Sequence, residues 1–264
     1  MKKSVLKKIK KYLLISLLNV TLIAWGENPA SSLRAFSLGD LRALSDELAN
    51  PALLPFSEQK QIGVSVYNRF QMKELNTGTL FLKYPNPRLD LGAQVCVFGF
   101  DDFRRTQIQL GFSKKVFSDF SVGINLRYQN VFSILEEKTQ HDLFSDIGLY
   151  YRLNEAICLA FNGQNLLKTQ KEQPAGTCFG LSCLVSKQAI FFSEAGYENG
   201  FSFAVGLEYE ILEQFLLRCG YQSRSKTPAF GIAYLWKDWT IETGFALHSV
   251  LGVSSQIGVS FNLH

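Results

Sequence analysis

The chain lacks the residue patterns that mark most catalytic and metal sites. Its only histidines, His141, His248 and His264, fall on separate predicted elements, and it contains no HExxH, GxSxG or P-loop motif. His248 precedes Ser249, and a serine beside a base is one element of a nucleophilic site. A strand-end histidine next to a loop serine is the simpler interpretation. We therefore expect no enzyme activity, no metal and no cofactor.

The five cysteines show no pairing pattern. They are Cys96, Cys158, Cys178, Cys183 and Cys219. The number is odd and no CxxC pair occurs, which argues against a disulfide framework or a zinc site. We expect most of them to act as small apolar side chains.

Beyond the N-terminus, no apolar run approaches the 18 or more residues of a transmembrane helix. The first eleven residues, MKKSVLKKIKK, hold six lysines, and a largely apolar run follows over 12–24. This order predicts a secretory signal peptide over residues 1–26, with an amphipathic basic helix as the alternative. Its removal takes away six lysines and no acid, so the net charge falls from +4 to −2. No basic surplus remains to bind nucleic acid.

After residue 60 the main pattern is alternation of large apolar residues with small or polar ones. In FSVGINLRYQ, residues 120–129, every even position is large and apolar and every odd position is small or polar. Such period-two segments are typical of β-strands with two different faces. We count about fourteen of them between residues 61 and 264.

The strands favour a membrane barrel over a soluble sandwich, which also alternates. Ten or eleven residues at about 3.3 Å each, tilted by about 45°, span roughly the 25 Å of an outer-membrane apolar band. Every second predicted connection is tight, and the longest, 130–141 and 165–176, fall in the other set. The sequence therefore predicts an all-β fold: a single antiparallel transmembrane β-barrel over 61–264. Both termini should lie on the periplasmic side of the outer membrane.

Residues 27–60 do not alternate and predict a short helix with loops. Leu41, Leu44 and Leu48 form one helical stripe. Ser37 and Asp40 have a spacing similar to a capping box, and Asn50-Pro51 should end the helix. Because fourteen strands enclose more space than their side chains fill, this segment is expected to plug the lumen as a hatch. A mobile periplasmic tail is the alternative.

The stretch SLGDLRALSDELANPALL, followed by IGVSVYNRF, resembles the start of the FadL-like outer-membrane barrels, and more narrowly their PorV/PorQ-like branch. The motif consists of Asn50, Pro51, Ala52 and Leu54. The resemblance covers the mature chain and implies fourteen strands with an N-terminal hatch. FadL-like members carry hydrophobic compounds across the outer membrane, and PorV/PorQ-like members are accessory components of type IX secretion.

The inward faces of the predicted strands carry charges of both signs. By alternation, the residues expected to line the lumen are Arg127, Asp146, Arg152, Glu194, Glu208, Glu210, Arg218 and Glu242. They could pair with one another or with the hatch, or they could line a path for solutes. We favour pairing with the hatch.

Two functions follow from this outline. The mostly small and polar inward face and the short outer loops favour an accessory or docking role in envelope secretion or assembly, with other envelope proteins as partners. The alternative is hatch-gated passive transport of small hydrophobic or amphipathic molecules. Both place the barrel in outer-membrane lipid.

Overall fold

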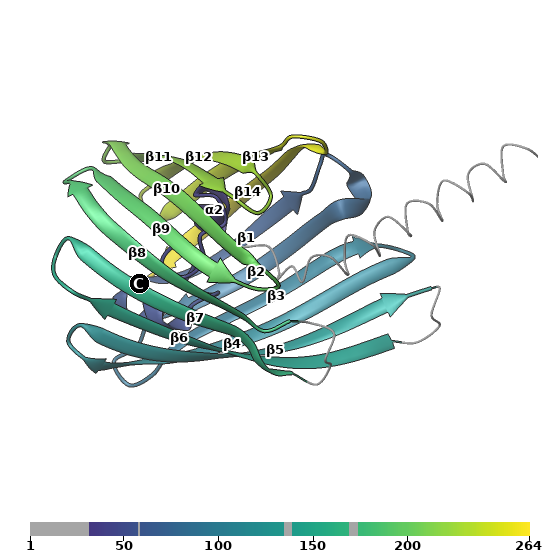
Figure 1. Ribbon diagram of the computed structural model, residues 1–264, viewed down its shortest axis with the longest axis horizontal. Coiled ribbons are helices and arrows are strands. Elements are labelled where there is room, and N and C mark those ends of the chain that lie inside the picture. The colour runs from purple at the N-terminus through teal and green to yellow at the C-terminus, as the bar shows by residue number, and fades with distance from the viewer. Residues whose placement is uncertain (1–31, 58, 135–138, 169–173) are drawn as a thin grey trace, which may run out of the picture.

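The computed structural model describes residues 32–57, 59–134, 139–168 and 174–264. The predicted leader, residues 1–26, lies outside these ranges. No helix within them is long and apolar enough to cross a membrane. Most of the described chain forms one antiparallel sheet that curves around an interior (Figure 1).

Fourteen strands follow one another around this sheet, and each pairs with its neighbours in sequence. They are β1 (Lys60–Asn68), β2 (Asn76–Tyr84), β3 (Asp90–Phe100), β4 (Phe103–Phe117), β5 (Phe120–Ser133), β6 (Thr139–Arg152), β7 (Ile157–Lys168), β8 (Gly176–Ser186), β9 (Ala189–Tyr197), β10 (Phe201–Leu212), β11 (Phe215–Gln222), β12 (Thr227–Trp236), β13 (Trp239–His248) and β14 (Gly252–Leu263). β1 also pairs with β14, with Lys60 opposite Leu263, so the barrel closes without a free edge. The predicted fourteen-stranded antiparallel barrel is confirmed.

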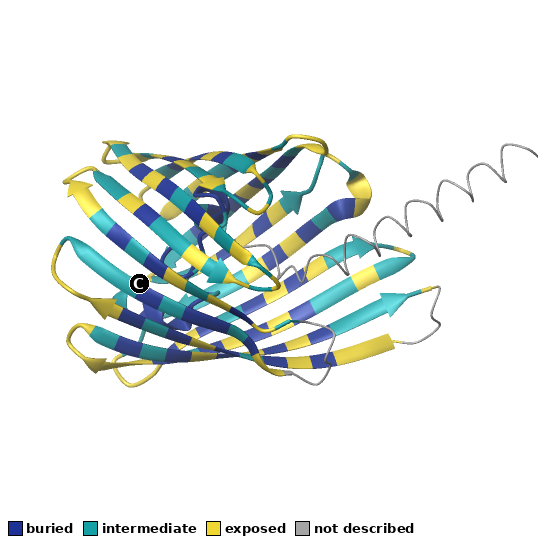
Figure 2. Ribbon diagram, viewed as in Figure 1, coloured by how far each residue is buried: buried dark blue, intermediate teal, exposed yellow. Residues whose placement is uncertain are grey.

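The alternation seen in the sequence separates the two faces of the wall. On β5, Ile124 and Leu126 point outward and are 51% and 45% exposed, whereas Asn125 and Arg127 point inward and are 1% and 3% exposed. Figure 2 shows the same banding of buried and exposed positions along most strands. The barrel therefore has an apolar exterior and a polar interior, the reverse of a soluble protein.

The connections lie at two rims. One, which we call the short-turn rim, carries the turns that follow β2, β4, β6, β8, β10 and β12, together with the start of β1 and the end of β14. The other, the loop rim, carries the remaining connections. The loops predicted over 130–141 and 165–176 are shorter than expected, because β5, β6 and β7 continue into them. The connection between β3 and β4 at this rim is also a tight turn.

Residues 32–57, here called the inner segment, lie inside the barrel (Figure 1, purple). The segment contains α2 (Leu33–Ser37) and the 3-10 helix η1 (Pro51–Phe56); a third short helix, η2 (Lys73–Leu75), lies between β1 and β2. Contacts of α2 reach β11 to β14, and those of η1 reach β3 to β6. The inner segment thus touches opposite sides of the wall.

The helix predicted over the leucine stripe was misplaced. The helix ends at Ser37, and Asp40 has a φ of 63°, which right-handed helix excludes. Ser32, not Ser37, caps α2, since its Oγ accepts a hydrogen bond of 3.2 Å from the Ala35 N–H. Asn50 begins η1, where it was expected to end a helix: its Oδ1 accepts from the Ala52 N–H at 3.2 Å.

Candidate functional site

Glycines on the inner wall let the inner segment approach the sheet closely. A Cβ placed at any of ten wall glycines would lie within 3.4 Å of an atom of the inner segment. They are Gly92, Gly111, Gly123, Gly148, Gly180, Gly206, Gly220, Gly231, Gly244 and Gly258, here called the glycine belt. Since the belt extends over ten strands, the inner segment is fitted to the wall on nearly all sides.

The Asn-Pro-Ala-x-Leu motif is buried at the centre of these contacts. The Asn50 side chain is fully buried, and its Nδ2 donates to the Ala43 carbonyl at 2.8 Å. Pro51 opens η1, while Ala52 and Leu54 are 0% exposed. Wall amides hold the chain just before the motif: the Asn125 and Asn162 Nδ2 atoms donate to the carbonyl of Ala49 at 3.1 and 2.8 Å. The motif therefore fixes the end of the inner segment.

A chain of charges joins α2 to the wall. Arg34 forms a bidentate pair with Glu208 of β10, at 3.0 and 2.7 Å. Arg218 of β11 contacts the same carboxylate at 2.7 Å and reaches Glu242 of β13 at 2.5 Å. Bidentate geometry makes such pairs directional as well as strong. The three predicted wall residues are thus brought together around one arginine of the inner segment.

Two further carboxylates tie the middle of the inner segment. Glu194 of β9 accepts hydrogen bonds from the backbone N–H groups of Arg42 and Ala43, at 2.9 and 2.7 Å. Lys83 of β2 pairs with Glu47 at 3.0 Å. Burial opposes the charge of Glu47, but Lys83 and Arg34 hold the pKa of its carboxyl below the ordinary value. These contacts anchor the segment to opposite walls.

Arg127 and Asp146 pair with each other, not with the inner segment. Their 2.9 Å ion pair is buried, and Asp146 also accepts from the backbone N–H of Asn165 at 2.8 Å. Asn165 has a φ of 54° and lies where the register between β6 and β7 is interrupted. The pair therefore stabilises a bulge in β7.

The last two predicted lumen residues lie near the short-turn rim. The Arg152 guanidinium stacks over the Phe56 ring at 5.0 Å, and Lys115 lies over the same ring at 4.2 Å. Phe56 also packs against Tyr150, with ring centroids 4.5 Å apart. Glu210 is partly exposed near the end of β10. These contacts of Phe56 hold the end of the inner segment at the short-turn rim.

Above the inner segment, a cavity of about 340 Å³ extends to the loop rim. Its apolar lining includes Phe36, Tyr67, Phe70, Leu75 and Phe98. Its charged lining comprises Asp40, Arg42, Arg69, Arg105, Glu194, Glu198 and Arg224. Small-molecule sites commonly have this volume and this mixture of apolar surface with a few polar groups.

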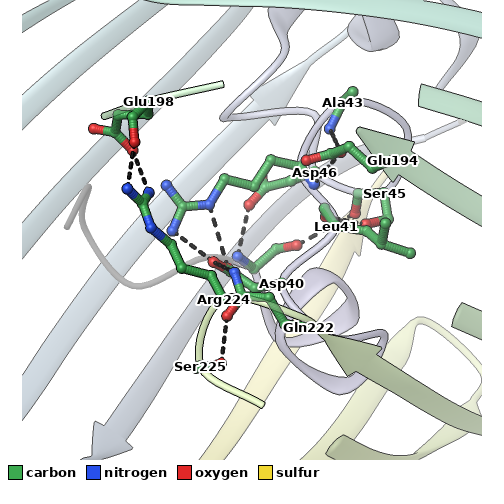
Figure 3. Close-up of polar contacts among 12 residues, drawn as sticks. Asp40, Leu41, Ala43, Ser45, Asp46, Glu194, Glu198, Gln222, Arg224 and Ser225 are labelled. Carbon is green, nitrogen blue, oxygen red and sulfur yellow. Dashed lines mark hydrogen bonds and ion pairs between the residues drawn. The ribbon is translucent and has the colours of Figure 1, made fainter. Parts of the chain in front are cut away.

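Most charges on the β9 to β12 side of the cavity are already engaged (Figure 3). Arg42 pairs with Asp40 at 2.9 Å, and Arg224 lies 3.5 Å from the Glu198 carboxylate and also donates to its carbonyl. Arg69 and Arg105 lie on the opposite side. Burial and the charge of Arg105 lower the pKa of Arg69 to about 10.

The histidines do not assemble a site. His141 stacks on Tyr128 outside the barrel, with its Nδ1 2.6 Å from the tyrosine hydroxyl. His248 accepts from the backbone N–H groups of Val250 and Leu251, and His264 lies 3.1 Å from Asp238. No group of three or more potential metal ligands occurs in the described part of the chain. The five cysteines are free thiols.

No family model and no curated protein matches the chain. Among solved structures, it is similar in fold to FadL-type outer-membrane transporters. The Ralstonia pickettii toluene transporter TbuX superposes with a TM-score of 0.66 at 12% identity, over 88% of this chain and 98% of that chain.

Two other solved structures agree. The Pseudomonas putida toluene transporter TodX superposes with a TM-score of 0.66 at 13% identity, over 89% of this chain and 98% of that chain. A Pseudomonas aeruginosa FadL homologue superposes with a TM-score of 0.63 at 11% identity, over 89% of this chain and 97% of that chain. The chain therefore has the barrel fold of the FadL-like transporters. These similarities give no support to the narrower PorV/PorQ-like resemblance.

Two cavity residues were not among the predicted lumen residues, although the alternation places both on the inward face. In RRTQIQLG, Arg105 and Gln107 share the inward positions of Gln109. Arg69 has the same parity as the inward residues Ser65 and Tyr67, although it lies just beyond the end of β1.

Proposed function

We propose that the protein is an outer-membrane channel for small hydrophobic or amphipathic molecules, with the inner segment as its hatch. The cavity carries this proposal: it is partly apolar, extends to the loop rim, and ends on the inner segment. The barrel's apolar exterior fits hydrocarbon, and the short-turn rim fits the periplasmic side. In this orientation both ends of the barrel sheet face the periplasm.

The similar solved structures favour transport over docking. TbuX and TodX are toluene transporters, and CymD, a monoaromatic hydrocarbon channel, superposes with a TM-score of 0.67 at 12% identity. The accessory role in secretion rests on the PorV/PorQ-like resemblance, the small and polar inward face and the short outer loops, and none of these similar solved structures supports it.

Passage through the lumen requires the inner segment to move. Leu38, Leu41 and Leu54 are almost completely buried, and η1 fills the interior near β3 to β6. A ligand in the cavity therefore meets a closed floor. Its movement would break the ion pairs of Arg34 with Glu208 and of Glu47 with Lys83.

The test is entry of N-phenyl-1-naphthylamine into vesicles whose outer leaflet is lipopolysaccharide, which slows the passage of apolar solutes. Vesicles holding the full chain should take up this fluorescent probe several-fold faster than vesicles without protein. A matched vesicle preparation with an unrelated, plugged barrel of similar size controls for leaks. Equal rates in all three would refute the proposal.

A further inference from the structure

One wall of the cavity carries an unusual set of hydrogen-bond donors. Arg105 and Gln107 are successive inward residues of β4; Phe98 and Cys96 lie opposite them on β3, and Thr77 of β2 lies opposite Phe98. Gln107 is only 5% exposed, yet its Nε2 has no hydrogen-bond partner among the described residues. A buried amide donor without a partner is destabilising, and an acceptor in the cavity would satisfy it.

The carboxylates that line the cavity are engaged elsewhere than at Arg105. The cavity carboxylates Asp40 and Glu198 pair with other arginines, and Glu194 accepts two backbone N–H groups. Arg105 forms no ion pair with any carboxylate in the described part of the chain; its guanidinium rests 5.3 Å from the Phe98 ring. A bound anion would balance the charge of Arg105.

An apolar surface lies beside this wall, because Tyr67 of β1 falls in the same register row as Thr77, Phe98 and Arg105. Phe36 and Tyr67 meet edge to face with ring centroids 5.3 Å apart, and both line the cavity with Leu75. A flat ring can pack against such a pair by offset or edge-on contact. The cavity thus combines hydrogen-bond donors without an acceptor with an aromatic surface.

We infer that this wall, formed by Arg105 and Gln107, is a subsite for the carboxylate of a small ring-bearing acid, such as an arene carboxylate. The ring lies against Phe36 and Tyr67. This inference rests on the proposed channel function and names the class of molecule that the channel selects. It distinguishes this chain from a channel for neutral hydrocarbons, because a neutral arene leaves the Gln107 amide and the Arg105 charge unsatisfied.

Calorimetric titration of the full chain in detergent tests the subsite with benzoate and toluene, which share one ring. Benzoate should bind more tightly than toluene. Arg105→Met keeps the apolar stem and removes the charge, and Gln107→Leu keeps the volume and removes the amide. Each should weaken benzoate binding by about tenfold to a hundredfold, as expected for a lost hydrogen bond to a charged group, and leave toluene binding unchanged.

Arg104→Gln is the matched control. Arg104 precedes Arg105 on β4 but is exposed on the outer face, so this variant should bind benzoate as the wild type does. Heat-dependent mobility in electrophoresis shows whether each variant is folded. Equal affinity for benzoate and toluene, or an equal loss in the Arg104 and Arg105 variants, would overturn the subsite.

The two proposals fail differently. If the protein speeds entry of N-phenyl-1-naphthylamine but prefers toluene to benzoate, the channel stands and the carboxylate subsite is wrong. If benzoate binds as predicted but no solute crosses faster, the subsite stands as a binding site and the channel function is wrong.

Discussion

Gly220→Ala tests whether the glycine belt positions the inner segment. A Cβ at Gly220 would lie 2.0 Å from the Leu38 carbonyl carbon and 2.5 Å from the Gly39 nitrogen. These atoms are backbone, and carbon atoms pack best at about 3.5–4.0 Å, so the inner segment must retreat by more than 1 Å. Gly39 has a φ of 84° and itself lies against the Tyr221 backbone, which leaves little room for adjustment.

The expected cost is about 1–3 kcal/mol of unfolding free energy, the usual range for overpacking a tight interior. Denaturant unfolding in lipid vesicles measures it. Trypsin provides a second readout, because Arg34 and Arg42 lie in the inner segment and should become cleavable when the segment moves. Gly78→Ala is the control: nothing lies within 4 Å of its added Cβ, and its stability should change by less than about 0.5 kcal/mol.

The reasoning fails if Gly220→Ala unfolds at the same denaturant concentration as Gly78→Ala and its inner segment resists trypsin equally well. That result would mean that the inner segment is loosely held and that the close contacts carry no energy.

Three further predictions concern charge. Glu208→Gln leaves the half-buried Arg34 and the buried Arg218 sharing a neutral group, and it should destabilise the barrel by about 3 kcal/mol in denaturant titrations; an unchanged midpoint would contradict the anchoring role. Leu126→Arg, on the outer face, should cost about 2–4 kcal/mol in vesicles if that face meets lipid, and nothing if it meets water. The pKa of Glu47 is lowered, so its contribution is present above the unfolded pKa and is lost as pH falls through the folded value. Glu47→Gln should therefore be less stable than wild type at pH 7 and equal to it in strong acid; a constant difference would exclude the pairing with Lys83.

The barrel was predictable because each strand keeps one face in a single kind of surroundings. Alternation such as that of Ile124, Asn125 and Leu126 therefore survives in the sequence, and it predicted the number of strands. The lengths of the outer connections were not predictable, since the polar ends of β5 and β6 continue as strand above the apolar band.

The inner segment was harder to predict because it has no outward face. Helical periodicity assumes one buried side and one wet side, but wall residues surround this segment. Leu41 and Leu48 are buried without forming a helical stripe, and Ser45 and Asn50 are buried as well. The partner of Arg34 depends on the path that the inner segment takes through the barrel. The sequence could therefore place Glu208 on the inward face, but it could not identify Arg34 as the partner of Glu208.

A reversible lock between the inner segment and the wall tests the central claim most directly. A Cβ at Gly180 would lie 3.0 Å from the Ala43 Cβ, which a small shift brings into the range of a disulfide. Ala43→Cys with Gly180→Cys would be made in a chain whose five native cysteines are replaced by alanine.

The measurement is entry of N-phenyl-1-naphthylamine into the lipopolysaccharide-coated vesicles before and after reduction. The oxidised protein should be no faster than empty vesicles, and reduction should restore the rate of the cysteine-free chain. Equal, protein-dependent rates in the oxidised and reduced states would contradict the account, because solutes would then cross without displacement of the inner segment.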